Sequence, residues 1–100
     1  MQDSRQDNPL QVRLIELVFA DAQSPQTATR MVIEANPDAR ALELVYVLAL
    51  IATDLQASFH PDPHWTYADW LEAAVGVSCS VYAAGQMGIS DPTLAEISQF

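Results

Sequence analysis

The sequence predicts an all-α fold: a single compact bundle of about five helices with a long hydrophobic central helix. Three observations support this fold class. Apolar residues recur at helical spacing, a helix-capping residue repeatedly precedes a proline, and no segment alternates as a half-buried strand would. The chain has 100 residues, half of them hydrophobic, so it can bury one core. We therefore expect one helical domain at 9–100, preceded by a flexible N-terminus at 1–8.

The clearest local pattern is a capping residue followed by proline. The side-chain oxygen of the first residue accepts a backbone N–H of the first helical turn, and proline at the first helical position has no N–H to leave unpaired. Each such pair therefore predicts a helix start. The four pairs are Asn8-Pro9, Ser24-Pro25, Asn36-Pro37 and Asp91-Pro92.

Apolar periodicity predicts a helix behind each pair. The first is expected at 9–22, and the second is a short, one-sided helix behind Ser24. The third, at about 37–58, is predicted to be the core helix, because its middle is apolar all round and such a helix is surrounded by others. Its valines also suit a buried strand, but its length favours a helix. A last short helix is expected to bury Leu94 and Ile97.

A further helix is expected from Tyr67 to about Gln86. Thr66 and Asp69 are three residues apart, as in a capping box with Asp in place of Glu or Gln. Gly85 and Gly88 can end the helix. Its predicted inner face comprises Trp70, Leu71, Ala74, Val75, Val77, Val81 and Tyr82.

The charge of the chain is acidic and unevenly distributed. Thirteen acidic residues and four arginines give a net charge of −9, and residues 41–100 contain no Lys or Arg. Phosphate backbones are bound mainly through Lys and Arg, so we expect no direct nucleic-acid binding. An acidic half without cations favours a partner protein with a basic surface, although ordinary solubility charge is the simpler explanation.

Cysteine usage and hydropathy predict a cytoplasmic protein. Cys79 is the only cysteine, so no disulfide can form within the chain. The N-terminal residues lack the apolar core of a secretory signal. The longest apolar run, from Leu44 to Ala52, is far shorter than the ~20 residues that cross a bilayer, so no membrane association is expected.

The sequence contains no catalytic or cofactor motif, so we expect neither an enzyme nor a bound cofactor. The only cluster of metal-ligand residue types is His60 and His64 with Asp62 between them. A zinc site normally needs three or four protein ligands, and the intervening prolines favour a stiff interhelical connection instead. Cys79 is predicted to lie mid-helix without nearby cations, which favours a small apolar residue near the core over a nucleophile.

An aromatic cluster near the start of the helix at 67–86 favours protein interaction. Trp65, Tyr67 and Trp70 lie close together in sequence, and such residues are common at interface hot spots. Trp70 also suits the core, and Trp65 the end of the bundle. The predicted acidic-rimmed aromatic patch consists of Asp62, Trp65, Tyr67, Asp69, Trp70 and Glu72.

A stripe of small residues is a second candidate contact. Gly76, Ser80 and Ala84 recur at four-residue spacing along the same helix, which permits the close approach of another helix. Ala49 and Ala52 of the core helix are natural partners within the chain. The alternative is a seam between two copies of the chain in a homodimer.

These patterns favour a small acidic helical protein–protein interaction module that self-associates and binds a basic region of another protein. One alternative is an inhibitor or immunity-type protein that mimics nucleic-acid charge. A second is a ligand-binding or metal-binding regulator that uses the His60–Trp65 loop. A third is an enzyme with Asp69, Glu72 or a histidine as its base.

Overall fold

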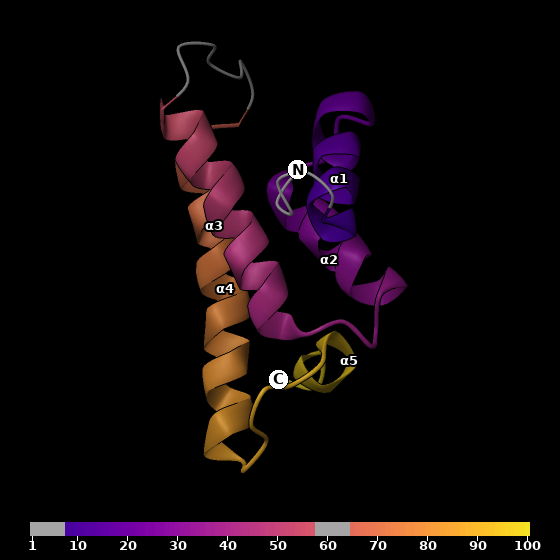
Figure 1. Ribbon diagram of the computed structural model, residues 1–100, viewed down its shortest axis with the longest axis vertical. Helices are drawn as coiled ribbons and strands as arrows, with labels where there is room; N and C mark the ends of the chain where they lie inside the picture. The colour runs from indigo at the N-terminus through magenta and orange to yellow at the C-terminus, as the bar shows by residue number, and fades with distance from the viewer. Residues whose placement is uncertain (1–7, 58–64) are drawn as a thin grey trace, which may run out of the picture.

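The computed structural model describes residues 8–57 and 65–100, and every regular element within these ranges is helical (Figure 1). No β-strand occurs in this part of the chain, so the predicted all-α class is confirmed. The elements are α1 (Pro9–Ile15), the π-helical turn η1 (Glu16–Ala20), α2 (Pro25–Ala35), α3 (Ala41–Ala57), α4 (Tyr67–Gln86) and α5 (Leu94–Ile97).

The two long helices, α3 and α4, pair with each other, and the shorter helices pack against this pair. α3 and α4 run antiparallel and contact each other over most of their length (Figure 1). α1 packs against α3, and α2 packs against α4, so both lie on the same side of the long pair. The short α5 contacts α2 and α4 at the other end of the molecule from the last turn of α3. No helix of the described chain covers the opposite side of the α3–α4 pair.

The core lies between the α3–α4 pair and α1–α2. Its fully buried large side chains include Leu14 of α1, Leu44 and Leu48 of α3, Trp70 of α4 and Leu94 of α5. The expected burial of Leu94 and Ile97 is confirmed. The expectation that α3 is surrounded by other helices is wrong. Its buried residues recur at three- and four-residue spacing on one side, whereas Leu42 and Tyr46 are half exposed.

Three predicted helix starts are confirmed by their capping contacts. Asn8 Oδ1 accepts the N–H of Leu10 at 2.9 Å, and Ser24 Oγ accepts the N–H of Thr27 at 3.1 Å. At the third start, the Thr66 N–H donates to Asp69 Oδ2 at 2.8 Å. α4 then runs from Tyr67 to Gln86, as the sequence predicts.

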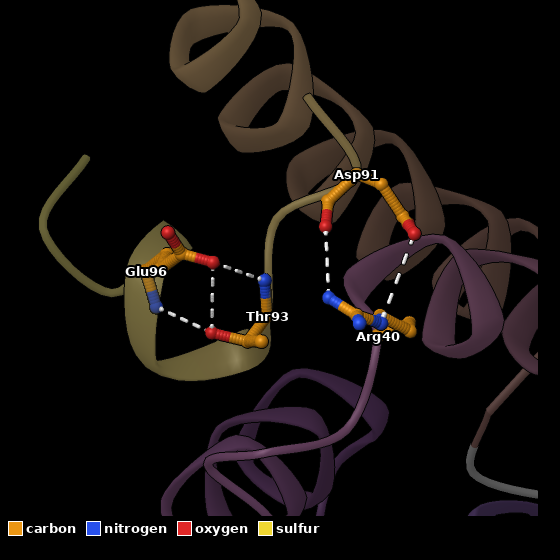
Figure 2. A network of polar contacts seen from close by, with 4 residues as sticks. All are labelled: Arg40, Asp91, Thr93 and Glu96. Atoms are coloured by element: carbon orange, nitrogen blue, oxygen red, sulfur yellow. Dashed lines mark hydrogen bonds and ion pairs between the residues drawn. The ribbon is translucent and has the colours of Figure 1, made fainter. Parts of the chain in front are cut away.

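The other two predicted starts are wrong. The Asn36 side chain closes α2 by donating from Nδ2 to the carbonyl of Val32 at 2.9 Å, and α3 begins only at Ala41. α5 begins at Leu94, where Thr93 is the cap (Figure 2). The Thr93 N–H donates to Glu96 Oε1 at 2.9 Å, and the Glu96 N–H donates to Thr93 Oγ1 at 3.3 Å. Thr93 and Glu96 therefore form a capping box.

Pairing between two connections explains these shifts. The connection from α2 to α3 lies against the one from α4 to α5, where the Leu94 N–H donates to the Ala39 carbonyl at 2.8 Å. Arg40 reaches Asp91 twice: Nη1 donates to the backbone carbonyl at 3.2 Å, and Nε lies 3.7 Å from Oδ2 (Figure 2). The backbone after each proline therefore forms tertiary hydrogen bonds in place of a helical turn.

The first predicted helix, at 9–22, is divided in two. From Glu16 the pattern widens to π-type bonding, in which the Asp21 N–H donates to the Glu16 carbonyl at 3.1 Å. The segment ends at Ala22, whose φ of +59° lies in the left-handed region. Gly88 ends α4 in the same region, with a φ of +87°, and the Ile89 N–H donates back to the Ala84 carbonyl at 2.9 Å.

Candidate interaction surfaces

The predicted aromatic patch does not form a single surface. Trp70 is fully buried, and Phe19 of η1 stacks on it with ring centroids 6.4 Å apart and an interplanar angle of 17°. The Trp70 indole Nε1 is buried and has no hydrogen-bond acceptor within the described chain. Trp65 is half-buried against the core, and only Tyr67 of the three is exposed. Trp70 is therefore a core residue.

The acidic residues assigned to that patch also separate. Asp69 caps α4, as described above, and its backbone carbonyl accepts a hydrogen bond from Gln26 Nε2 of α2 at 3.3 Å. Glu72 is exposed, one turn further along α4. Asp62, together with the weak metal candidates His60 and His64, lies outside the described residues. Within the described part of the chain, no group of three His, Cys, Asp or Glu residues is arranged to hold a metal ion.

The predicted inner face of α4 is correct on one side and wrong on the other. Trp70, Ala74 and Val77 are buried as expected. Leu71, Val75 and Tyr82 are exposed instead. The apolar residues of α4 therefore extend further around the helix than its buried side does. Part of its apolar surface remains exposed to solvent.

This uncovered surface continues onto α3. Leu42, Tyr46 and Ala49 are spaced to share one side of α3, as are Leu71, Val75, Ser78 and Tyr82 on α4. Hydrogen bonds show which residues face α1 and α2: Asn8 Nδ2 of the α1 cap donates to Glu43 at 3.1 Å, and Gln26 of α2 reaches the backbone carbonyl of Asp69. Apart from Val75, which also borders the groove beside α2, the two stripes therefore lie on the side of the α3–α4 pair that faces away from α1 and α2. We call these seven residues the outer face.

A groove lies on the other side of α4, between α2 and α4, and α5 and the residues after it bound one end. Its volume is about 820 Å³, which is within the range of binding pockets. Its apolar lining residues include Ile33 of α2, Ala73 and Val77 of α4, Ile97 of α5 and Phe100. We call it the α2–α4 groove. Val75 lies between the two surfaces, because it also lines the edge of the groove.

The predicted stripe of small residues forms part of this groove. Gly76 and Ser80 line it, and no heavy atom lies within 4 Å of a Cβ built on Gly76, so no helix of the described chain packs against that position. Ala84, in contrast, is buried. The three residues therefore do not serve one helix contact within the chain. A contact of Gly76 and Ser80 with another molecule stays a prediction.

The charged residues of the groove are Arg30 and Glu34 on α2 and Glu72 on α4. All three are exposed, so each wall carries one acid accessible to a partner. The lining residues of α2 and α5 were not foreseen from the sequence. Arg30 and Glu34 lie off the apolar side of α2, as a solvated helix face also would, and only the placement of α2 beside α4 makes them part of a groove.

Cys79 differs from its predicted position near the core: it is exposed on α4. None of the helices in the described ranges is long and apolar enough to cross a bilayer. Comparisons of the chain with protein families, with curated proteins and with solved structures found no match. Function is therefore argued from the two surfaces themselves.

Proposed function

We propose that this chain is a non-enzymatic protein–protein interaction module that binds a basic, amphipathic helix of another protein in the α2–α4 groove. A cytoplasmic location, inferred from the lone cysteine, belongs to the same proposal. The observation that carries it is a groove with an apolar floor and an acid on each wall. Helix-in-groove recognition uses such a floor for the apolar side of the incoming helix.

The shape of the groove supports a helical occupant. Gly76, Ala73 and Ser80 keep the α4 wall low, because small side chains let a second backbone approach closely. Ile33, which is half-buried, and Phe100, which is exposed, then provide apolar contact for the partner's side chains. This assignment replaces the aromatic patch as the binding surface, since the burial of Trp70 removes the centre of that patch.

The charge distribution supports a basic partner. Glu34 and Glu72 outnumber Arg30 among the charged residues of the groove. From residue 41 onward the chain contains no Lys or Arg that could repel a cationic peptide. Opposite charges at the rim of an interface mainly raise the association rate, and salt screens them. Binding is therefore expected to weaken at high salt without being abolished.

The test uses two synthetic amphipathic helical peptides with the same apolar side. One has Lys and Arg on its polar side, and the other has Glu at those positions. Each peptide is titrated into the isotopically labelled protein, and the amide chemical shifts are recorded. The amide shifts of Gly76, Ser80 and Ile97 are expected to change with the basic peptide alone. Equal binding of both peptides, or shifts confined to residues outside the groove, would contradict the proposal.

A matched pair of glycine variants localises the contact. Gly76→Leu adds a side chain that enters the groove, at a position where a Cβ has no atom within 4 Å. It is expected to lower affinity by at least about tenfold, or ~1.4 kcal/mol. Gly85→Leu is the control, because Gly85 lies on the same helix, has equally open space and does not line the groove. It is expected to leave affinity unchanged.

The alternatives remain predictions. A protein that mimics nucleic-acid charge would bind through carboxylates with little need for the apolar floor, so Gly76→Leu would then have little effect. A regulator that uses the His60–Trp65 loop would respond to substitution of His60 and His64 instead. An enzyme with Asp69 or Glu72 as a base has no support from the groove, since Asp69 is engaged in capping α4.

A further inference from the structure

The outer face is a second apolar surface, which shares only Val75 with the edge of the groove. Its large side chains are unusually accessible for a helical pair: Tyr82 is 70% exposed, Val75 59%, Leu42 and Tyr46 52% each, and Leu71 41%. Apolar patches on soluble monomers rarely exceed a few hundred Å². A tyrosine side chain buries about 150–250 Å² when fully covered, so the two tyrosines alone expose an area of that order.

We propose that the outer face binds a second copy of this chain, so that the two α3–α4 pairs form a four-helix layer at the centre of a homodimer. This inference is independent of the α2–α4 groove and would stand if the groove bound nothing.

Area is the first argument for a second copy. The five large residues form one patch, because Leu42 and Tyr46 near the start of α3 lie at the same end as Tyr82 near the end of antiparallel α4. Val75 and Leu71 continue the patch along α4. Pairing the face with itself doubles the apolar area that is buried. With the surrounding polar residues, the total approaches the ~1,200 Å² at which specific interfaces begin.

Charge is the second argument. Each chain has a net charge of −9, so two copies repel each other electrostatically. Contact at most places on the surface would bring acidic residues of one copy close to acidic residues of the other. The outer face contains no Asp, Glu, Arg or His. In a two-fold interface the same patch meets itself, so a neutral patch is the surface through which two such acidic chains can approach. A basic partner would instead be drawn to the acids outside this face.

Packing geometry is the third argument. Ala49 on α3 and Ser78 on α4 are the small residues of the face: Ala49 lies one turn after Tyr46, and Ser78 separates Val75 from Tyr82. A small residue leaves a hole into which a large side chain of a facing helix can insert. The tyrosines of one protomer are therefore placed to fill the depressions of its partner.

The test is the oligomeric state of the full chain, measured by light scattering and sedimentation over a range of concentrations. A dimer is expected at micromolar to millimolar concentration. Tyr46→Glu and Tyr82→Glu each place a carboxylate in the interface, and each is expected to weaken dimerisation by at least about 100-fold. Circular dichroism checks that both variants keep the helical content of the parent.

Val12→Glu is the matched control, because it adds the same charge at an exposed apolar position on α1. It is expected to leave the dimer intact. A chain that stays monomeric at every concentration would overturn the proposal, as would loss of the dimer in Val12→Glu with retention in both tyrosine variants. Failure of the groove is distinguishable: Gly76→Leu should remain dimeric, and monomeric Tyr46→Glu should still bind the basic peptide.

Discussion

Single residues fix where the helices of this chain begin and end. Ser24 and Asn8 accept backbone N–H groups that would otherwise lack acceptors at the start of α2 and α1. Ala22 ends a helical segment instead of starting one. It follows η1 with a left-handed backbone conformation that alanine rarely adopts. A single substitution at Ser24 or at Ala22 should therefore change the free energy of unfolding.

Ser24→Ala is expected to lower the free energy of unfolding by about 1 kcal/mol, because the Thr27 N–H loses its acceptor. Urea titration followed by circular dichroism measures the change. Ser90→Ala is the control in the exposed connection after α4, and its effect should stay within about 0.5 kcal/mol. Equal losses from both substitutions would show that Ser24 does not stabilise the protein as a cap.

Ala22→Gly is expected to raise the free energy of unfolding by about 0.5–1 kcal/mol. Glycine removes the left-handed strain of about 1–2 kcal/mol, and its greater freedom in the unfolded chain offsets part of that gain. Ala20→Gly, two positions earlier and inside η1, is expected to lower stability by about 1 kcal/mol. Opposite signs for the same substitution are thus the expected result, and two losses would contradict the backbone argument.

At the scale of elements, the sequence predicted the existence of every helix but not every start. The starts with a capping side chain and no competing contact were right, as at Ser24 and Thr66. The starts at Asn36 and Asp91 were wrong because the backbone after each proline pairs with the other connection, through the hydrogen bond from Leu94 to Ala39. Capping rules use only neighbouring residues, so they cannot predict a hydrogen bond to a segment that is distant in sequence.

The shortness of α5 makes it dependent on such contacts. An isolated turn of helix is unstable in water, so the capping box of Thr93 and Glu96 and the pairing with Ala39 must hold it. Thr93→Ala is expected to cost about 1 kcal/mol and to accelerate amide hydrogen exchange at Leu94 and Ile97. Thr53→Ala, at an exposed position of α3 away from α5, is the matched control. Unchanged exchange at both amides of Thr93→Ala would argue that α5 is held by burial of Leu94 alone.

At the scale of the whole molecule, the surfaces were less predictable than the fold. Apolar residues cover so much of α4 that periodicity alone cannot say which of them face the core, and Val75 and Tyr82 were therefore assigned to the wrong side. Trp70 was open to both readings, and packing against Phe19 places it inside. The α2–α4 groove depends on two helices that are distant in sequence. No local pattern in either helix indicates that they are neighbours.

The net charge of the whole chain is expected to make its stability depend on salt. The described part contains two Arg–carboxylate ion pairs, Arg13–Glu16 and Arg40–Asp91. Every side chain in them is at least half exposed, so they contribute little to stability. Repulsion among thirteen acids opposed by four arginines then dominates the electrostatics of folding. Added sodium chloride screens this repulsion, so we expect the unfolding midpoint to rise with salt at fixed protein concentration.

A relief of about 1 kcal/mol corresponds to a rise of about 4–8 °C for a domain of this size. Calorimetry at low and physiological ionic strength measures it. The double variant Asp38→Asn with Asp54→Asn removes two exposed acids and should therefore start from a higher midpoint and respond less to salt. A midpoint that falls as salt is added would mean that favourable ion pairs outweigh the repulsion, which the exposure of both pairs argues against.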